Sequence, residues 1–183
     1  MPNWSFNSMS VRGDDKEVQR LRDTIKRVET DKDGTQIEIP FSFQNVIPMP
    51  EELKDTIAPT KEPNSKEAKA LRAKYGCDNW YDWRWEHWGT KWDACDCFEE
   101  KGDDEQFFVR FNTAWSFPTP VVVELSKQFP NLEFVYDAEE ESGVYDFTVV
   151  FKNGRVVSYA ENERDEETGE VKAIEKPVGD FWK

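Results

Sequence analysis

The sequence predicts an α+β fold built around one antiparallel sheet. Some stretches alternate apolar and polar residues, as half-buried strands do, and others space apolar residues three and four apart, as amphipathic helices do. When a middle insertion at about residues 35–92 is set aside, the element order is strand, helix, strand, strand, helix, strand and then an extra hairpin. This is the split βαβ, or ferredoxin-like, order, and right-handed crossovers would place both helices on one face of the sheet.

The first strand and the first helix are predicted from residues 3–34. Residues 3–13 alternate in part and indicate a strand that ends at Gly13. Asp14 and Asp15 follow, where an N-cap and a first-turn acid are favoured. Apolar residues then recur along one face of a helix of about four turns, namely Val18, Leu21, Ile25 and Val28. A polar turn at residues 30–34 ends this helix.

The insertion mixes a strand with helices. A strand is expected over 35–43, because four apolar residues share one side of it: Ile37, Ile39, Phe41 and Phe43. A short helical turn is expected at 51–54, and Ser65 caps an amphipathic helix at 66–75. An aromatic helix should follow up to about Trp88. It is apolar nearly all round, so we expect the tryptophans of this segment to be mostly buried: Trp80, Trp83, Trp88 and Trp92.

The second half supplies the remaining core elements. Strands are predicted at 90–98 and 106–115, a helix at 121–129, a strand at 132–136, and a hairpin of 144–152 with 155–161 around Asn153-Gly154. We therefore expect one ferredoxin-like domain over 1–161, carrying the insertion, and a loosely held, charged C-terminal tail over 162–183.

Composition limits the classes of function. The chain has 24 Lys and Arg against 38 Asp and Glu, for a net charge of −14. Such a charge repels polyphosphate, which disfavours a general DNA or RNA binder. No stretch approaches the ~18 consecutive apolar residues of a membrane span, and no secretory signal is recognisable. Three cysteines are too few for a disulfide scaffold, so we expect a cytoplasmic protein that does not bind membranes.

The residue types for catalysis or metal binding are sparse. The Cys and His residues are Cys77, His87, Cys95 and Cys97. These residue types suit zinc, and Asp93 and Asp96 could add oxygen ligands. The spacing of the four residues along the chain, however, is poor for a zinc site. The alternative is thiols and a histidine packed beside tryptophans. No nucleophile-elbow, P-loop or dinucleotide motif is present. We expect no enzyme activity, no cofactor and no metal, with a small metal-dependent enzyme as an alternative.

A nucleic-acid-binding module on the sheet is a second alternative. Sheet-strand aromatics stack bases in ferredoxin-like RNA-recognition domains, and the candidates here are Phe107, Phe108 and Phe111. Such rings are usually surrounded by Lys and Arg, whereas only Arg110 is close to them in the sequence.

Four stretches resemble the YubB-type ferredoxin-like domain family of phage and plasmid proteins. They are PNWSFNSMSV, FQNVIPMPEEL, NWYDWRWEHWGTKWDA and FNTAWSFPTPVVVELSKQFPNLEF, which occur in the family's order within residues 2–134. WGTKWDA and TAWSFPTPVV are the most specific strings. The resemblance implies the same fold, carriage on mobile elements and an accessory role. It implies no reaction. Because such plasmid genes often lie near anti-restriction and other anti-defence functions, it also suggests inhibition of host defence.

Clustered carboxylates offer a mechanism for such inhibition. They can occupy the basic channel of a nucleic-acid enzyme through the field that steers DNA into it, although acidic loops also simply keep proteins soluble. The preferred cluster is a predicted loop, Asp137 with Glu139, Glu140 and Glu141, and the second is Glu99 and Glu100 with Asp103 and Asp104. The C-terminal acids Glu161, Glu163 and 165–167 are a third group.

These observations together predict a protein-binding accessory protein. We expect it to bind a host protein in the cytoplasm, namely a nucleic-acid-binding defence complex such as a restriction or CRISPR complex, without binding nucleic acid directly. It would thus be an anti-restriction or anti-CRISPR protein with an acidic, nucleic-acid-mimicking surface.

Overall fold

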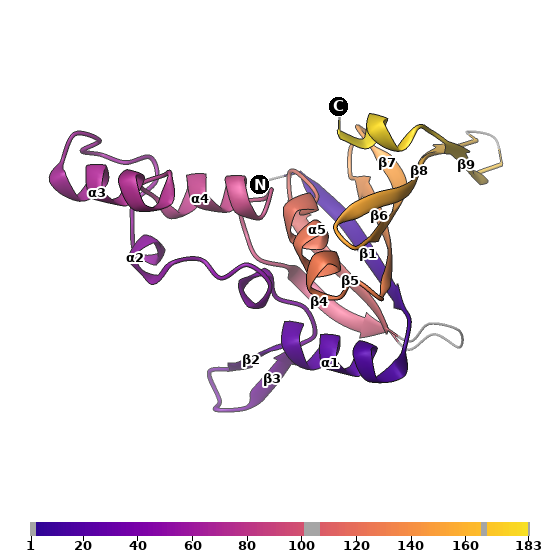
Figure 1. Ribbon diagram of the computed structural model, residues 1–183, viewed down its shortest axis with the longest axis horizontal. Coiled ribbons are helices and arrows are strands. Elements are labelled where there is room, and N and C mark those ends of the chain that lie inside the picture. Colours follow the sequence, from indigo (N-terminus) through magenta and orange to yellow (C-terminus); the bar gives the residue numbers. More distant parts are fainter. Residues whose placement is uncertain (1–2, 101–106, 166–167, 183) are drawn as a thin grey trace.

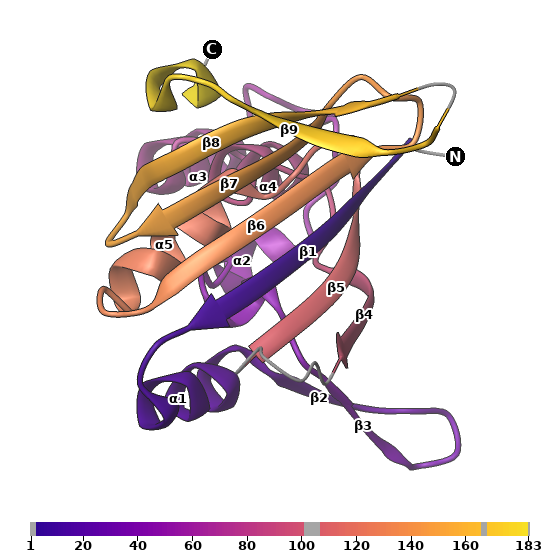
Figure 2. The same ribbon diagram turned by 90° about the vertical axis from the view of Figure 1, so that its right-hand side faces the viewer.

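A seven-stranded antiparallel sheet forms the centre of the protein (Figures 1 and 2). The computed structural model describes residues 3–100, 107–165 and 168–182. The strand order is β4-β5-β1-β6-β7-β8-β9. The strands are β1 (Trp4–Arg12), β4 (Cys95–Glu100), β5 (Phe107–Ala114), β6 (Glu133–Glu140), β7 (Asp146–Lys152), β8 (Arg155–Arg164) and β9 (Val171–Glu175).

The split βαβ unit lies within this sheet. Helix α1 (Asp15–Ile25) follows β1, and helix α5 (Thr119–Gln128) follows β5. In Figure 2 helix α5 lies behind the sheet, and α1 lies below it, beyond the end of β1. Strands β4, β5, β1 and β6 are neighbours in that order and pair antiparallel, so the predicted α+β, ferredoxin-like fold is confirmed.

The core fills the space between the sheet and its helices. Alternate residues of each strand point toward the helices, and in β5 these are Phe107, Val109 and Phe111, each at most 1% exposed. Helices α1 and α5 contribute the apolar residues that their periodicity predicts, namely Val18, Leu21 and Ile25 with Val121, Val122 and Leu125.

A separate hairpin corrects two of the predicted elements. The first helix ends at Ile25, not beyond Val28, because Lys26 is extended and Arg27–Thr30 becomes strand β2, paired with β3 (Gln36–Ile39). Val28 is accordingly 52% exposed. The predicted strand 35–43 is shorter than expected, since the chain leaves the hairpin at Pro40 and carries Phe41 and Phe43 into the core.

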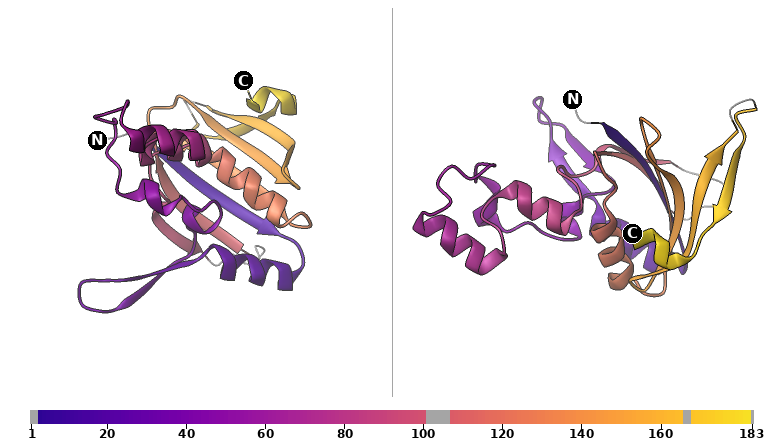
Figure 3. Two further views of the ribbon diagram at one scale, coloured as in Figure 1. Left: turned by 60° about the vertical axis from the view of Figure 1, so that its left-hand side comes forward. Right: turned by 90° about the horizontal axis from the view of Figure 1, so that it is seen from above.

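The helical insertion projects from one side of the sheet, as Figures 1 and 3 show. It contains the 3₁₀ turn Phe43–Asn45, α2 (Glu51–Lys54), α3 (Lys66–Tyr75) and α4 (Trp80–His87). The predicted cap of α3 is confirmed: the Ser65 hydroxyl accepts a hydrogen bond from the Ala68 amide at 3.1 Å. Asn79 caps α4 in the same way, accepting from the amides of Tyr81 and Asp82.

The burial of the tryptophans follows the prediction in part. Trp83 and Trp88 are 4% and 1% exposed, and the indole of Trp88 donates to the Ile47 carbonyl at 2.9 Å. Trp80 and Trp92 are only half-buried. The prediction of mostly buried rings holds best for Trp83 and Trp88, and Trp80 keeps an exposed part because it lines a cleft.

Three boundaries also differ from expectation. Strand β4 starts at Cys95, not near residue 90. Strand β6 continues to Glu140, so the expected acidic loop after residue 136 is mostly strand, held by pairing with both β1 and β7. The segment expected to be loosely held contains β9 and a 3₁₀ turn (Val178–Trp182), from which Phe181 contacts the rings of Phe117, Phe147 and Phe151.

The described part of the chain has no helix that is both long and apolar enough to cross a membrane.

Candidate functional site: the open face of the sheet

The candidate site lies on the face of the sheet that points away from α1 and α5. In Figure 2 helices α3, α4 and α5 lie behind the sheet and α1 lies below it, so this open face is directed toward the viewer. Directly paired residues on neighbouring strands share a face. The pairing therefore lays out two rows across it: Phe98, Arg110, Ser8, Asp137 and Thr148 form one, and Asn112, Phe6, Glu139 and Asp146 form the other.

One half of the open face, on β4, β5 and β1, is aromatic. Phe6 and Phe98 are 48% and 49% exposed, and Phe108 is half-buried on the same face. Arg110 lies among them. Its guanidinium is 5.3 Å from the centre of the Phe108 ring, and its Nε is 3.4 Å from a Glu100 carboxylate oxygen. This guanidinium is thus already partly neutralised.

The other half, on β6 and β7, is acidic. The Asp137 carboxylate accepts hydrogen bonds from the hydroxyls of Ser8 at 3.2 Å and Thr148 at 2.6 Å. Asp146 accepts from the Asn162 amide at 2.8 Å. Glu139 is exposed between them. These hydrogen bonds from residues of neighbouring strands hold the carboxylates of Asp137 and Asp146 in place. The Glu139 carboxylate stays accessible.

A shallow depression joins the two halves. Its volume is about 290 Å³, and Phe6, Arg110, Asp137, Glu139 and Asp146 are among its lining residues. An aromatic ring and three carboxylates around one hollow can accept a cationic side chain, because a guanidinium stacks on rings and pairs with carboxylates.

The predicted acidic cluster at the end of β6 divides between two environments. Glu140 points to the opposite side from Glu139 and is 4% exposed. It accepts hydrogen bonds from the Ser142 hydroxyl at 2.6 Å and amide at 2.8 Å, and from the Asn3 amide group at 2.8 Å. These bonds hold the pKa of Glu140 below its ordinary value, the Ser142 side chain having the largest effect. Glu140 therefore stabilises the β6–β7 turn.

The other predicted acids are distributed around the molecule. Glu141 is exposed and accepts a hydrogen bond from the Trp4 amide at 2.7 Å. Glu99 pairs with Arg22 at 2.7 Å, and Glu161 pairs with Lys176 at 3.0 Å. Asp103 and Asp104 lie outside the described residues, as do residues 166–167. The structure thus places Asp137 and Glu139 around one depression, and it does not bring the other predicted acidic residues to that depression.

Two groups of this face escaped the sequence analysis. Phe6 alternates with buried residues of β1, a signal that could have placed it on the outer face, and Phe98 lies next to the half-buried Cys97 of β4. Asp146 becomes a neighbour of Glu139 only through the β6–β7 register. Conversely, Phe107 and Phe111, considered there for base stacking, are each 1% exposed in the core.

The four Cys and His residues do not gather at one point. No group of three or more possible His, Cys, Asp or Glu ligands occurs within the described parts of the chain. The His87 ring stacks on Trp83 at 4.3 Å, and Cys95 contacts the Asp93 carbonyl. Burial raises the pKa of the Cys97 thiol to about 12.

Asp93 is a structural residue. Its carboxylate accepts hydrogen bonds from the Phe43 amide at 2.6 Å and the Ser42 hydroxyl at 2.7 Å, and it pairs with Arg27 at 3.0 Å. These contacts fix the insertion to the start of β4, so the carboxylate is used within the fold.

One family comparison agrees with the fold. Residues 87–177 match the family model described as the ferredoxin-like domain in Api92-like protein, so this part of the chain is similar to that domain. A similar solved structure is the protein api92 from Yersinia pseudotuberculosis, with 16% identity and a TM-score of 0.43 over 49% of this chain and 32% of that one. The match therefore spans about a third of the length of api92. No curated protein matches the chain.

Proposed function

We propose that this chain is a non-enzymatic accessory protein of a phage or plasmid that binds a basic protein surface through the open face of its sheet. The observation that supports this most is the meeting of the exposed Phe6 ring with three carboxylates around one depression, beside the exposed ring of Phe98 on the same face. The partner class follows from complementarity, because arginine and lysine side chains combine an apolar stem with a charged head.

The chemistry of the face favours protein over nucleic acid. Asp137, Glu139 and Asp146 would repel phosphates, while they attract a guanidinium or ammonium group and steer a basic partner from a distance. Phe6 and Phe98 would cover the stems of the incoming side chains. Removal of their exposed surface from water adds about 25 cal/mol per Å² to the binding free energy before association costs.

The identity of the partner is proposed from the wider charge of the chain and from the resemblance. A net charge of −14 suits the basic channel of a nucleic-acid enzyme. The similarity to YubB-type phage and plasmid proteins supports the proposal that the basic channel belongs to a host defence complex. The proposal is therefore an anti-restriction or anti-CRISPR inhibitor that acts in the host cytoplasm.

The test uses two variants with matched changes of charge and ring count. Phe6→Ala with Glu139→Lys alters the open face, whereas Trp182→Ala with Glu67→Lys alters an exposed ring and an exposed acid elsewhere. Both changes leave Glu140 intact, since reversing its charge would break the β6–β7 turn. Phage or plasmid survival in a defended host is measured at equal expression, together with capture of the defence complex.

We expect the open-face variant to lose protection and capture, and the control to keep both. Full protection by the open-face variant would contradict the role of this face, and no protection by the wild type in any defended host would contradict inhibition. Nucleic-acid binding is the alternative that the exposed Phe6, Phe98 and Phe108 favour. Titrations with labelled DNA and RNA across a salt series test it directly, and saturable binding lost in the Phe6→Ala variant would replace our proposal by that one.

A further inference from the structure

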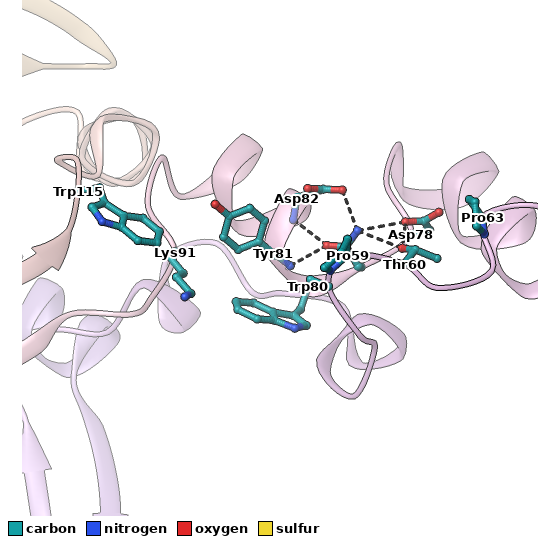
Figure 4. A pocket seen from close by; sticks show the side chains of 11 residues that line it. Pro59, Thr60, Pro63, Asp78, Trp80, Tyr81, Asp82, Lys91 and Trp115 are labelled. Atoms are coloured by element: carbon teal, nitrogen blue, oxygen red, sulfur yellow. Dashed lines mark hydrogen bonds between the residues drawn. The ribbon is translucent and has the colours of Figure 1, made fainter. Parts of the chain in front are cut away.

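A second concavity lies between the helical insertion and the sheet, and it shares no lining residue with the depression on the open face. Its volume is about 520 Å³. Three parts of the chain line it, as Figure 4 shows: the loop with Pro59 and Pro63, the start of α4 with Trp80 and Tyr81, and two residues at the ends of sheet strands, Lys91 before β4 and Trp115 after β5. We refer to it as the aromatic cleft.

The rings of the aromatic cleft continue into a track along α4. Trp80 contacts Tyr81 edge-on at 5.7 Å, Tyr81 contacts Trp85 at 6.1 Å, and Trp85 stacks on Trp115 at 6.3 Å with planes 5° apart. Trp115 is 41% exposed. The track offers flat apolar surface to an elongated ligand, with Trp115 and Lys91 at one end and Pro63 at the other in Figure 4.

Trp115 holds an unusual backbone conformation. Its φ is +68°, in the left-handed region that a large side chain rarely adopts. The Trp115 amide donates to the Asn3 carbonyl at 2.9 Å, and the Lys91 ammonium lies 5.1 Å from the centre of the indole ring. Strained positions that the surrounding structure maintains are typical of binding and active sites.

Most side-chain hydrogen-bond acceptors of the aromatic cleft already have partners within it. The Asp78 carboxylate accepts from the Thr60 hydroxyl at 2.5 Å and pairs with Arg72. The Asn79 carbonyl oxygen accepts from two amides of α4, and the Asp82 carboxylate accepts from the Asn79 amide group at 2.7 Å.

The donors, in contrast, remain available. Within the described residues, four side chains of the aromatic cleft form no hydrogen bond or ion pair, although each carries a donor group: Trp80, Tyr81, Lys91 and Trp115. These donors are two indole N–H groups, a phenol hydroxyl and an ammonium group. The aromatic cleft therefore suits a ligand that is rich in acceptors and poor in donors.

A proline-rich peptide has this chemistry. Proline has no backbone N–H, and a polyproline II helix makes no internal hydrogen bonds, so its carbonyl groups are free to accept. Proline rings also pack in aromatic-lined grooves. An acidic side chain of the peptide would complement Lys91, which has no carboxylate partner within the described residues. We propose that the aromatic cleft binds an extended, proline-rich segment of a partner protein that carries an acidic residue.

Other elongated ligands fit less well. The hydroxyl groups of a saccharide need acceptors as well as donors, and most of the side-chain acceptors here already have partners. A single-stranded nucleic acid stacks on rings but also needs a basic groove along its backbone. The aromatic cleft offers Lys91 as a cation and carries the acids Asp78 and Asp82.

The first experiment measures binding of a synthetic peptide with repeating Pro-Pro-Glu to the full chain, by tryptophan fluorescence and calorimetry. Three residues per turn place all its glutamates along one edge. We expect saturable binding, weakened at least about tenfold by Trp115→Ala, as for buried aromatic anchors at interfaces. Trp182→Ala is the matched control, since Trp182 is 56% exposed and lies outside the aromatic cleft. Its binding should be unchanged.

Two further variants sharpen this experiment. Trp115→Gly repeats the ring deletion with a residue that accepts a positive φ, in case the alanine variant fails to fold. Lys91→Glu should weaken binding of the Pro-Pro-Glu peptide and strengthen that of a Pro-Pro-Lys peptide, which a merely structural lysine would not do.

Several outcomes would overturn the proposal. They are absence of binding, equal binding of a flexible Gly-Ser-Glu repeat, and binding that survives loss of the Trp115 ring. Trp115-dependent binding of a single-stranded oligonucleotide or an oligosaccharide, in place of the peptide, would also overturn it. These results leave the open-face proposal untouched, because the two sites share no residue.

Discussion

The two faces of the central sheet carry the same residue types with opposite roles. On the face toward the helices, Phe111 is 1% exposed and Glu140 is 4% exposed, whereas on the open face Phe6 is 48% exposed and Glu139 is accessible. The difference arises from the alternation of side chains along each strand. A phenylalanine or glutamate in this chain therefore acquires its role from the side of the sheet on which it lies.

The largest contrast between the two faces is expected for phenylalanine. Phe111 contacts the rings of Phe41, Phe43 and Tyr136, so Phe111→Ala should lower the free energy of unfolding by about 3–5 kcal/mol. Phe6→Ala should cost less than about 1 kcal/mol, because half of the ring is already in water. Urea unfolding of the two variants measures this, and equal losses would show that the open face is covered in solution.

A smaller contrast is expected for aspartate. Asp93 accepts hydrogen bonds that fix the insertion, and its side chain is 16% exposed. Asp93→Ala should cost about 2–3 kcal/mol, since it leaves buried donors unpaired. Asp137→Ala on the open face should cost about 1 kcal/mol or less, because water can replace its partners. Thermal melting of both variants tests which substitution costs more stability. A larger loss of stability for Asp137→Ala than for Asp93→Ala would contradict this prediction.

The two neighbouring glutamates should differ in the pH dependence of stability. Hydrogen bonds from Ser142 and Asn3 lower the pKa of Glu140 in the folded protein. A lowered carboxyl pKa adds stability that is fully present above the unfolded pKa of about 4.3 and is lost as the pH falls through the folded pKa. Glu140→Gln should therefore destabilise the protein near neutral pH, with a difference from wild type that narrows in acid.

Glu139→Gln is the matched control, and because this side chain is exposed the substitution should change the free energy of unfolding little at neutral pH. Urea unfolding from neutral to acidic pH gives both comparisons. A Glu140→Gln difference that grows as the pH falls would contradict the assigned role.

The smallest difference between the two faces is expected on the edge strand β4, between Cys97 and Phe98. Burial raises the pKa of Cys97 to about 12, while its neighbour Phe98 points outward and is 49% exposed. Because the thiolate is the reactive form, Cys97 should react far more slowly with thiol reagents in the folded protein than in urea. Peptide mapping after labelling at about pH 8 distinguishes Cys97 from the other thiols, and rapid labelling without denaturant would contradict its burial.

Much of the fold could be predicted from local sequence, and less of the candidate site. The alternation in 106–115, the Ser65 cap and the Asn153-Gly154 turn are short-range signals, and all three match the structure. The acidic character of β6 was also visible. The depression itself was not, because Phe6 is far along the chain from Glu139 and Asp146 and meets them only through the register of β1 with β6.

By itself the sequence determined the order of the elements of the split βαβ unit, the side on which most core residues lie and the strongly acidic charge, because these depend on periodicity and composition. Tertiary structure decided where α1 stops, which neighbouring glutamate is buried, and that Trp115 stacks on Trp85 beside the aromatic cleft. Local periodicity specifies which way a side chain points along its own element. Which segment it then meets depends on register and long-range packing, where contacts between distant residues outweigh local preference.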